Sequence, residues 1–301
     1  MSEHTLVQPT KSRLPAWLRA MRPKQWVKNI LVFAAPVAAG ALFVPQVFVN
    51  TLWAFVAFSL ISASIYLIND VRDVDADRQH PKKRFRPIAA GEIAARPATV
   101  LAGVTMIASL AIGWWVAPML GITLAVYWLL QVGYSMFLKH QPILDLAMVA
   151  AGFLLRAVAG GVASGIELSQ WFLLVASFGS LFMVAGKRYS EMKELGSEAG
   201  TRASLERYSL SYLRFVWAIS CSIVIMSYSL WTFEQAREGQ LWGVPWTTIS
   251  IVPFTLALLR YAMDIDAGNA GEPEDVVLND RVLQGLAVLW LIPLGVGIFL
   301  H

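Results

Sequence analysis

A row of carboxylates follows the second apolar stretch of the chain. In NDVRDVDAD, Asn69, Asp73 and Asp77 are spaced at i, i+4 and i+8, so on a helix their side chains share one face about 5 to 6 Å apart. Like charges at that spacing repel, and a divalent cation offsets the repulsion. Mg²⁺ is generally held by one or two carboxylates, with water and a substrate phosphate completing its coordination. The spacing predicts a magnesium site made by Asp73 and Asp77, aided by Asn69 or Asp70.

Basic residues follow the acidic row directly. Four cationic side chains lie in the segment PKKRFRP: Lys82, Lys83, Arg84 and Arg86. Together with a bound metal, such cations can hold a polyphosphate. The alternative is a solvated helix end in which Arg72 and Arg78 pair with the acids. The row comes directly after an apolar run and directly before the basic cluster, which favours the phosphate-binding interpretation.

The composition is that of a membrane protein. Of the 301 residues, 57% are hydrophobic and only 15% are charged, a balance typical of polytopic membrane proteins. A membrane-spanning helix needs roughly 20 apolar residues. The apolar runs predict nine transmembrane helices, over residues 29–44, 46–68, 97–117, 119–138, 142–164, 168–186, 209–231, 244–262 and 282–300. The predicted fold class is therefore an all-α integral membrane protein.

The distribution of basic residues orients these spans. Lys and Arg are enriched in the cytoplasmic connections of membrane proteins. Of the 24 Lys and Arg residues, 22 lie before the first span or close to the connections on one side of the membrane. The two exceptions are Arg156, within a span, and Arg237, in a connection on the opposite side. We therefore expect the N-terminus and the acidic row on the cytoplasmic face of the plasma membrane, and the C-terminus on the opposite side.

The first 28 residues differ in character from the rest. Large apolar side chains are mixed there with basic ones: Trp17, Met21, Trp26, Arg19, Arg22, Lys24 and Lys28. This mixture is typical of an amphipathic helix that lies in the membrane interface. The sequence predicts a cytoplasmic interfacial amphipathic segment over residues 1–28, followed by a single nine-helix transmembrane catalytic domain over residues 29–301.

Further candidate residues lie at the cytoplasmic end of the predicted spans. The connection after the sixth span, AGKRYSEMKELGSE, holds Lys187 and Arg188 but no Asp, with Glu191 as a metal ligand or orienting acid. Other residues assigned to substrate binding are Lys24, Lys28, Tyr134, Lys139 and Tyr189. For the Lys and Arg residues among them there is an alternative explanation. Such residues lie at the cytoplasmic ends of membrane helices whether or not they bind a substrate.

One charge lies deep in a span. Arg156 is about 14 residues into the fifth predicted helix, where a charge is costly enough to count as a functional hypothesis by default. It can contact a substrate phosphate, or it can neutralise Asp145, which lies eleven residues earlier on roughly the same helical face. A second acidic segment, residues 264–275, is either a solvated loop or a lid with Gly268, Gly271 and Pro273 as hinges.

The two polar motifs resemble those of the UbiA superfamily of intramembrane prenyltransferases. NDVRDVDAD matches the NDxxDxxxD signature of that superfamily, and RPIAAGEI matches the RPxxxGxI run that follows it there. The resemblance covers nearly the whole chain. It implies a UbiA-type fold with nine helices around a central cavity, cytoplasmic cap loops and a lateral opening to lipid. The predicted catalytic residues are Asn69, Asp70, Asp73 and Asp77, of which Asp73, Asp77 and Asn69 hold Mg²⁺.

A departure from the superfamily pattern indicates the substrates. Most members carry a second aspartate-rich motif after the sixth span, where this chain has Lys187 and Arg188. Substrates with more anionic groups require more cationic side chains to bind them. The chain is similar to a branch of the superfamily that acts in actinobacterial cell-wall synthesis. That resemblance implies transfer of 5-phosphoribosyl from 5-phosphoribosyl 1-diphosphate to polyprenyl (decaprenyl) phosphate, with release of diphosphate, to make a precursor of the cell-wall arabinan of arabinogalactan.

Two other functions compete with this one. An ordinary prenyltransferase would move a prenyl group from polyprenyl diphosphate to an aromatic acceptor, and the missing second Asp motif argues against it. A membrane transporter is the alternative outside enzymes, because polytopic chains with an embedded Arg are often carriers. The predicted partners are phosphoribosyl diphosphate, polyprenyl phosphate and the lipid bilayer, with no nucleic acid. A homo-oligomer, such as a trimer, is left open.

Overall fold

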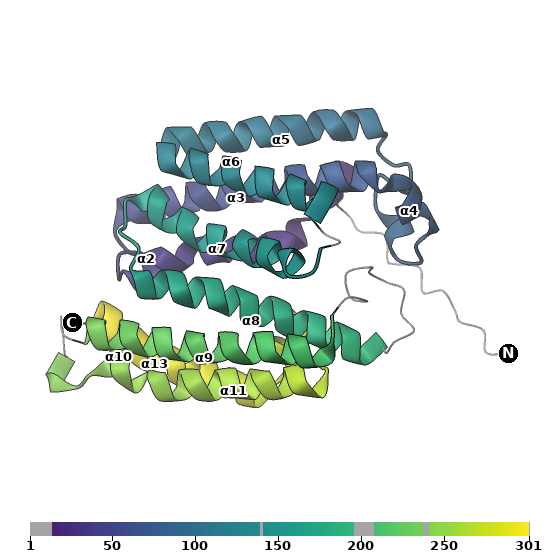
Figure 1. Ribbon diagram of the computed structural model, residues 1–301. Coiled ribbons are helices and arrows are strands. Elements are labelled where there is room, and N and C mark those ends of the chain that lie inside the picture. The colour runs from purple at the N-terminus through teal and green to yellow at the C-terminus, as the bar shows by residue number, and fades with distance from the viewer. Residues whose placement is uncertain (1–13, 139–140, 196–207, 237–240, 301) are drawn as a thin grey trace.

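The computed structural model describes residues 14–138, 141–195, 208–236 and 241–300, and in that part of the chain the regular structure is entirely helical (Figure 1). The long helices are α3 (Pro45–Arg72), α5 (Ala95–Val116), α6 (Pro118–Gly133), α7 (Leu144–Ser164), α8 (Gln170–Leu195), α9 (Leu210–Gln235), α11 (Ile251–Ala267) and α13 (Arg281–Phe299). The short α-helices are α1 (Ala16–Ala20), α2 (Ala34–Ala38), α4 (Val74–Gln79), α10 (Trp246–Ile249) and α12 (Pro273–Asn279). The described residues also hold three 3₁₀ segments, η1 (Pro23–Phe33), η2 (Lys83–Phe85) and η6 (Leu241–Gly243), and one π-helix, η3 (Tyr134–Leu138).

Eight helical stretches in the described part of the chain are long and apolar enough to cross a membrane. They are α3, α5, α6 with η3, α7, α8 up to Glu194, α9, α10 with α11, and α13. They correspond to the second to ninth predicted spans. The chain is a multi-pass membrane protein, and the prediction of an all-α integral membrane fold is confirmed.

The first predicted span, residues 29–44, is not a single regular helix, so the count of nine is not confirmed. The chain runs through eleven 3₁₀ residues of η1 and five α-helical residues of α2, then turns at Gly40. At about 2.0 Å and 1.5 Å of rise per residue, these two pieces extend roughly 30 Å. Their combined length therefore approaches the thickness of a bilayer core, although neither piece alone would span it.

Close packing against α7 accounts for the position of η1. Asn29 and Val32 on η1 are buried, and η1 contacts both α3 and α7. A Cβ atom on Gly160 of α7 would overlap the carbonyl oxygen of Val32 and lie 2.8 Å from its carbonyl carbon. A residue without a side chain is thus required where the two backbones meet.

The helices form two groups that meet along α7 and α8. In the first group α3 packs against α5, α6, α7 and η1, and in the second α8 packs against α9 and α11, while α13 packs against α10 and α11. Figure 1 shows the first group above the second, with α8 next to α7. The buried cores of the groups are separate, one around Phe58, Ile61 and Leu124, the other around Phe182, Leu213 and Ile265. A central cavity between them stays a prediction.

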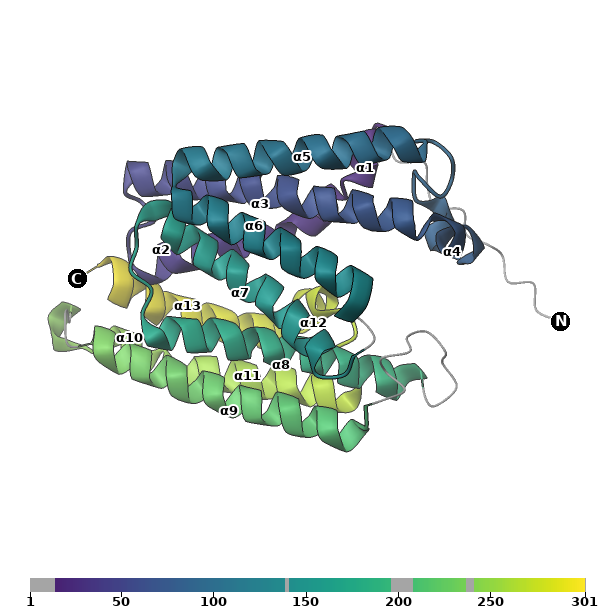
Figure 2. The same cartoon turned by 45° about the horizontal axis from the view of Figure 1, so that its top comes forward.

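The polar connections gather at one end of the bundle. Figures 1 and 2 show α4 and the last turns of α8 at this end, whereas α13 finishes at the opposite end. The helices α3 and α8 both run toward the α4 end, and α7 begins there. The same end therefore carries the acidic row after α3 and the basic residues near the end of α8, as the span order predicts.

The N-terminal segment is two short helices rather than one. α1 ends at Ala20, Arg22 has a left-handed backbone with φ of 54°, and Pro23 begins η1. Ala20 and Met21 are buried, while Trp17 is 52% exposed. The predicted boundary between residues 28 and 29 lies inside η1, and residues 1–13 are outside the described part of the chain. The division into an interfacial segment and a catalytic domain stays a prediction.

Substitution of Gly160 tests the contact between η1 and α7. Gly160→Ala is expected to lower the melting temperature in detergent, because overpacking costs about 1–3 kcal/mol and the added atom meets backbone rather than a flexible side chain. Gly103→Ala in α5 is the matched control, since nothing lies within 4 Å of its Cβ position. Equal melting temperatures for the two variants would contradict this account of the first segment.

Candidate active site

The acidic row keeps helical spacing across a junction between two helices. α3 ends at Arg72, and Asp73, with ψ of 12°, separates it from α4. The amide of Asp73 donates to the carbonyl of Asn69 (2.9 Å), and the amide of Asp77 donates to the carbonyl of Asp73 (2.8 Å). The i, i+4 arrangement that the sequence predicts is thus present in the backbone.

Two carboxylates of the row are buried and share one cation. Asp70 and Asp77 are 2% and 3% exposed. The Nη1 atom of Arg86 lies 3.2 Å from Asp70 Oδ1 and 2.6 Å from Asp77 Oδ2. Arg22, from the turn between α1 and η1, also pairs with Asp70 through its Nη2 atom. Each buried carboxylate therefore has a guanidinium partner from another part of the chain.

This arrangement fits a cation between Asp70 and Asp77. A single positively charged nitrogen already contacts one oxygen of each carboxylate, so the two oxygens converge on one position. In the described residues no group of three or more His, Cys, Asp or Glu side chains comes together. The residues present suit a metal that takes two carboxylates and completes its coordination with water and substrate, which is how Mg²⁺ is commonly bound.

The other two members of the row lie differently. Asn69 Oδ1 accepts a hydrogen bond of 2.6 Å from Ser135 Oγ on η3. Asp73 is half-buried and makes no ion pair within the described ranges. The alternative explanation, in which Arg72 and Arg78 pair with the acids, holds for Asp75 alone among the described ion pairs, because Asp75 pairs with Arg78 at 3.1 Å on the exposed face of α4.

Only one of the four basic residues after the row reaches the carboxylates. Lys82, Lys83 and Arg84 are exposed on and beside η2. His80 Nδ1 accepts hydrogen bonds from the amides of Lys82 and Lys83 at 3.1 Å and 3.2 Å, which holds this turn together. Three exposed cations thus border the buried pair of acids and are available to a ligand that enters from the polar end.

The turn that follows places Arg86. The amide of Ala90 donates to the carbonyl of Arg86 (2.8 Å), and the amide of Glu92 donates to the carbonyl of Pro87 (2.9 Å). Gly91 has φ of 78°, a conformation that glycine adopts at little cost. The RPIAAGEI motif thus forms a compact turn that returns the guanidinium of Arg86 to the end of α3.

A second ionic cluster lies between α7 and α8. Asp145, near the start of α7, is 1% exposed, and its Oδ2 atom lies 3.1 Å from Nε of Arg188. Arg188 is 5% exposed and also pairs through Nη1 with Glu191 Oε2 at 2.9 Å. Tyr134 donates its hydroxyl to Asp145 Oδ1 at 2.5 Å. Lys187 lies 3.7 Å from Glu191 Oε1 and is the more exposed of the two neighbouring cations.

The π-helix η3 connects the two clusters. Its adjacent residues Tyr134 and Ser135 contact Asp145 of the second cluster and Asn69 of the first. Arg72 also donates to the carbonyl of Ser135 at 2.8 Å. Because neighbouring Cα atoms are only about 3.8 Å apart, the clusters border one region at the polar end. A π-turn inside an α-helix often occurs at a functional site.

Arg156 forms a third cationic site, deeper in the bundle. It is 6% exposed and donates to Asn29 Oδ1 (2.8 Å), the Gly152 carbonyl (2.7 Å) and the Tyr127 hydroxyl (2.7 Å). Its guanidinium also lies 5.0 Å from the centroid of the Tyr127 ring. The hypothesis that it neutralises Asp145 is wrong, because Asp145 pairs with Arg188 instead. All of these partners of Arg156 are neutral groups.

The remaining predicted residues are spread over the polar end. Tyr189 is buried, accepts from Arg214 Nη2 at 2.8 Å and donates to Asp266 Oδ1 at 3.3 Å, so it links α8, α9 and α11. Lys24 is exposed and Lys28 is half-buried on η1. Lys139 lies outside the described residues. The structure thus gathers some predicted cations at the two clusters and leaves others apart from them.

Several residues in these contacts were not predicted as site residues, among them Arg22, Tyr127, Ser135, Asp145 and Tyr208. Asp145 was noted only as a partner for Arg156. Tyr208 accepts a hydrogen bond from the Ile143 amide at 2.7 Å, and burial raises the pKa of its hydroxyl. The composition of the N-terminal segment marked Arg22 as an interfacial cation, and no local spacing connects it with Asp70. Asp145 could have been predicted as a site residue from its position as a charged residue next to an apolar run.

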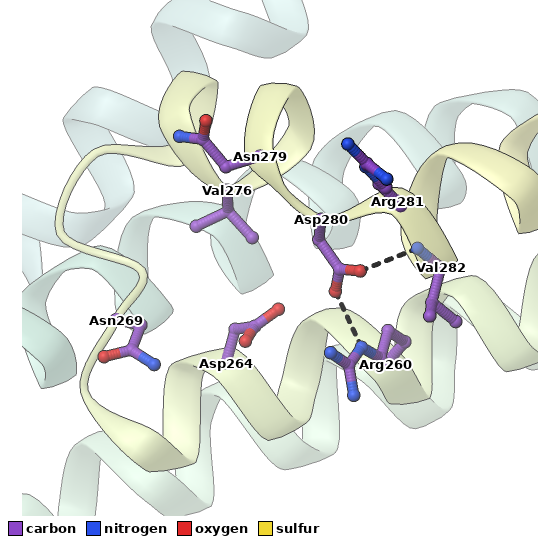
Figure 3. Close-up of a pocket in the computed structure, with 8 residues that line it drawn as sticks. All are labelled: Arg260, Asp264, Asn269, Val276, Asn279, Asp280, Arg281 and Val282. Carbon is purple, nitrogen blue, oxygen red and sulfur yellow. Dashed lines mark hydrogen bonds and ion pairs between the residues drawn. The ribbon is translucent and has the colours of Figure 1, made fainter.

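The acidic segment between α11 and α13 borders a separate pocket of about 560 Å³. Figure 3 shows Asp280 bonded to Arg260 and to the amide of Val282, with Asp264 nearby. The Arg260 Nε–Asp280 Oδ2 distance is 2.6 Å, and this hydrogen bond holds the pKa of Asp280 below its usual range. Asp280 also caps the N-terminus of α13. Asp280, which lies just beyond the predicted acidic segment of residues 264–275, therefore has a structural role in joining α11 to α13.

The fold and the ionic clusters define a class of protein: a multi-pass helical membrane protein with two clusters of paired carboxylates and guanidinium groups at one end of the bundle. The chain belongs to the UbiA prenyltransferase family, whose model matches residues 30–279. It is therefore a membrane transferase. The predicted superfamily resemblance is confirmed.

Curated relatives match the chain over nearly its whole length. It is 50% identical over 302 residues to a protein of Mycolicibacterium smegmatis named decaprenyl-phosphate phosphoribosyltransferase, covering 97% of this chain and 95% of that one. A protein of the same name from Mycobacterium tuberculosis strain H37Rv is 49% identical over 304 residues, with 99% of each chain covered. The protein of that name from Corynebacterium glutamicum is 50% identical over 300 residues, covering 97% of this chain and 90% of that one.

Solved structures share the fold at low sequence identity. A structure of digeranylgeranylglyceryl phosphate synthase superposes with a TM-score of 0.67 at 17% identity, covering 95% of this chain and 98% of that one. A UbiA homolog from Archaeoglobus fulgidus, bound to GPP and Mg²⁺, gives a TM-score of 0.64 at 19% identity, covering 95% of this chain and 100% of that one. These likenesses confirm the UbiA-type fold.

Removal of the shared cation tests the first cluster. Arg86→Gln is expected to lower the melting temperature in metal-free detergent by several degrees, because Asp70 and Asp77 then face each other without Arg86. The cost should fall below the roughly 3–5 kcal/mol of a broken, fully buried pair, since the Arg86 side chain is 29% exposed. Arg84→Gln, in the same loop and exposed, is expected to leave the melting temperature unchanged. If the two variants behaved alike, the pairing described here would be refuted.

Proposed function

We propose that the protein transfers the 5-phosphoribosyl group of 5-phosphoribosyl 1-diphosphate to a polyprenyl phosphate such as decaprenyl phosphate, with release of diphosphate. The observation that supports this proposal is the pair of ionic clusters joined by η3, in which guanidinium groups accompany buried carboxylates. A donor with two separate phosphate-bearing positions needs cations as well as a metal site. The name of the relatives with 49–50% identity, decaprenyl-phosphate phosphoribosyltransferase, supports decaprenyl phosphate as the acceptor and phosphoribosyl as the transferred group.

The donor diphosphate is proposed to bind at the acidic row. Asp70 and Asp77 converge on one position, and Asn69 and Asp73 lie on the same helical face one turn apart. Of the predicted ligands Asp73, Asp77 and Asn69, the contacts favour Asp77 together with Asp70. Mg²⁺ bound here would stabilise the negative charge of the leaving diphosphate. Solved structures of a UbiA homolog are bound to Mg²⁺ and to Cd²⁺, which supports a divalent cation.

Basic side chains are proposed to bind the diphosphate oxygens that the metal would not coordinate. Lys82, Lys83 and Arg84 are exposed beside the acidic pair, and Arg86 contacts it directly. When the donor and its metal bind, Arg86 exchanges its carboxylate partners for diphosphate oxygens. The positive charge then stays in the site without leaving a buried guanidinium unpaired.

The acceptor phosphate attacks the anomeric carbon of the ribose. One phosphate oxygen forms the new C–O bond with its own electron pair, and the bond from that carbon to the diphosphate breaks, so the diphosphate leaves with the electrons. The acceptor phosphate is already ionised near neutral pH, and no general base is needed. Residues proposed to hold the 5-phosphate and the acceptor phosphate are Lys24, Lys28, Tyr134, Lys139, Arg156, Lys187, Arg188 and Tyr189. Glu191 is proposed as the acid that orients Arg188.

The membrane arrangement is part of the same proposal. The polar end of the bundle, with both clusters, faces the cytoplasm of the cell, and α13 ends on the opposite side of the plasma membrane. The positive-inside distribution of Lys and Arg supports this orientation. Many large apolar side chains on the outside of the bundle, including Val100, Ile107 and Trp115, are more than 60% exposed. The polyprenyl chain of the acceptor would lie in the surrounding lipid.

Single carboxylate variants test the acidic row. Asp77→Asn is expected to lower the rate of phosphoribosyl transfer roughly 100-fold or more at saturating Mg²⁺, the scale on which one preorganised electrostatic contact acts in a transition state. Asp75→Asn, at a position whose side chain is 86% exposed, should keep nearly the full rate. Asp73→Asn and Asp70→Asn complete the series and decide which acid joins Asp77. Near-normal transfer by Asp77→Asn would remove the metal assignment.

A paired assay tests the substrates. Purified protein with Mg²⁺ receives phosphoribosyl diphosphate and decaprenyl phosphate in one reaction, and polyprenyl diphosphate with an aromatic acceptor in the other. Lipid-linked phosphoribose is expected in the first reaction alone. The guanidinium groups at both clusters suit a donor that carries phosphate at two separate positions. Product only in the second reaction would establish an ordinary prenyltransferase. Consumption of neither donor, with uptake of solute into proteoliposomes, would establish a transporter.

A further inference from the structure

The cluster between α7 and α8 contains a carboxylate that has no place in the reaction described so far. Asp145 is 1% exposed and lies at the second residue of α7, at the polar end of the bundle. Both of its oxygens are used: Oδ1 accepts from Tyr134, and Oδ2 accepts from Nε of Arg188. Both oxygens of Asp145 are thus directed at side chains of this cluster.

The contacts of Arg188 determine how its guanidinium is oriented. Nε is bonded to Asp145 and Nη1 to Glu191, at 3.1 Å and 2.9 Å. Two carboxylates on two different nitrogens fix the plane of the group, because a guanidinium presents its donors in a rigid fork. Nη2 makes no hydrogen bond to the residues that the structure describes, and it is not among their buried polar atoms without a partner. It is therefore the edge of Arg188 that remains for a ligand.

Stability alone does not account for this pair. Burying two charges costs several kcal/mol for each ion, and a buried ion pair is often no more stabilising than apolar residues of similar volume. The stability of the fold therefore does not explain why Asp145 and Arg188 are buried as a charged pair. Their position supplies an explanation, since η3 joins this cluster to Asn69 at the acidic row through the adjacent residues Tyr134 and Ser135.

We infer that Asp145 is a positioning residue, which acts through Arg188 to aim the open edge of that guanidinium at a phosphate group of a substrate. Tyr134 holds the other oxygen of Asp145 and so fixes the direction of the carboxylate. The phosphate belongs either to the 5-position of the donor or to the polyprenyl acceptor, since both present the same dianionic group. The inference rests on the proposed function for the identity of these substrates, and it adds Asp145 to the residues on which binding depends.

A double-mutant cycle tests whether Asp145 acts through Arg188. Asp145→Asn is isosteric and removes only the charge, and it is expected to raise the KM of one phosphorylated substrate about tenfold or more while kcat changes less than about threefold. Arg188→Ala should raise the same KM. The double variant should bind no worse than Arg188→Ala alone, because effects that share one intermediary are not additive. Asp75→Asn is the matched control for the loss of one carboxylate.

The KM values identify which phosphate is bound. An increase for phosphoribosyl diphosphate alone places the 5-phosphate on Arg188, and an increase for polyprenyl phosphate alone places the acceptor there. A lowered kcat with both KM values unchanged overturns the inference. The inference is also overturned if Asp145→Asn lowers the affinity of Arg188→Ala by the same factor as it lowers the affinity of the unsubstituted protein. The carboxylate would then act independently of the guanidinium.

Two further variants keep the test decisive if Asp145→Asn does not fold. Tyr134→Phe leaves the Asp145–Arg188 pair charged and removes only the hydrogen bond from the tyrosine, so it should raise the same KM by about two- to fivefold. Asp145→Glu keeps the charge and should recover part of the affinity. If neither variant moves that KM, the inference is refuted.

Failure of the proposed function would be seen separately. If the unsubstituted protein bound and used polyprenyl diphosphate but not phosphoribosyl diphosphate, the substrate proposal would fail. The same cycle would then be run on the affinity for polyprenyl diphosphate, measured by calorimetry without turnover. An equal loss of affinity in Asp145→Asn, Arg188→Ala and the double variant would support the positioning role of Asp145. Unchanged affinity in Asp145→Asn would refute it.

Discussion

The structure depends on pairing buried carboxylates with guanidinium groups from distant parts of the chain. Asp70 is held by Arg22 and Arg86, and Asp145 by Arg188. In a medium of low dielectric constant an unpaired charge is very costly, so these pairs restrict how α3, α7, α8 and the loop after α4 can be arranged. The same restriction brings together groups of both signs at one end of an apolar bundle. The proposed binding site for phosphates would thus consist of the same ion pairs that offset the cost of burying the carboxylates.

Much of the architecture could be predicted from the sequence, because the membrane imposes a length and a charge rule that act locally. Eight spans followed from these rules. The family followed from the NDVRDVDAD and RPIAAGEI motifs, and the shared face of Asn69, Asp73 and Asp77 followed from helix periodicity. The identity of the paired acids did not. Spacing puts several carboxylates on one face but does not tell which are buried, and Asp70 rather than Asp73 joins Asp77 at Arg86. Arg22 is 48 residues from Asp70, and Asp145 is 43 residues from Arg188. Such contacts arise only when separate helices pack.

The first segment shows a second limit of prediction by hydropathy. The apolar run after residue 28 suggested an ordinary span, yet the chain adopts a 3₁₀ form there and lies tightly against α7. Asn29 and Val32 are buried on this segment, and Asn29 accepts a hydrogen bond from Arg156. The polar contact and the close backbone approach at Gly160 both require the partner helix, and neither can be inferred from a count of apolar residues. Packing decides the local conformation here.

The π-helix η3 makes the number of residues in this part of the chain significant. A π-turn accommodates one residue more than an α-turn, and here the extra residue falls where Tyr134 faces Asp145 while Ser135 faces Asn69. Loss of a single amino acid from this turn would restore ordinary α geometry and rotate the helix before it by about 100° relative to the residues after it. The two side chains could not then reach both partners. This turn therefore tolerates substitutions far better than one-residue deletions, so the number of residues that lead into α7 is constrained.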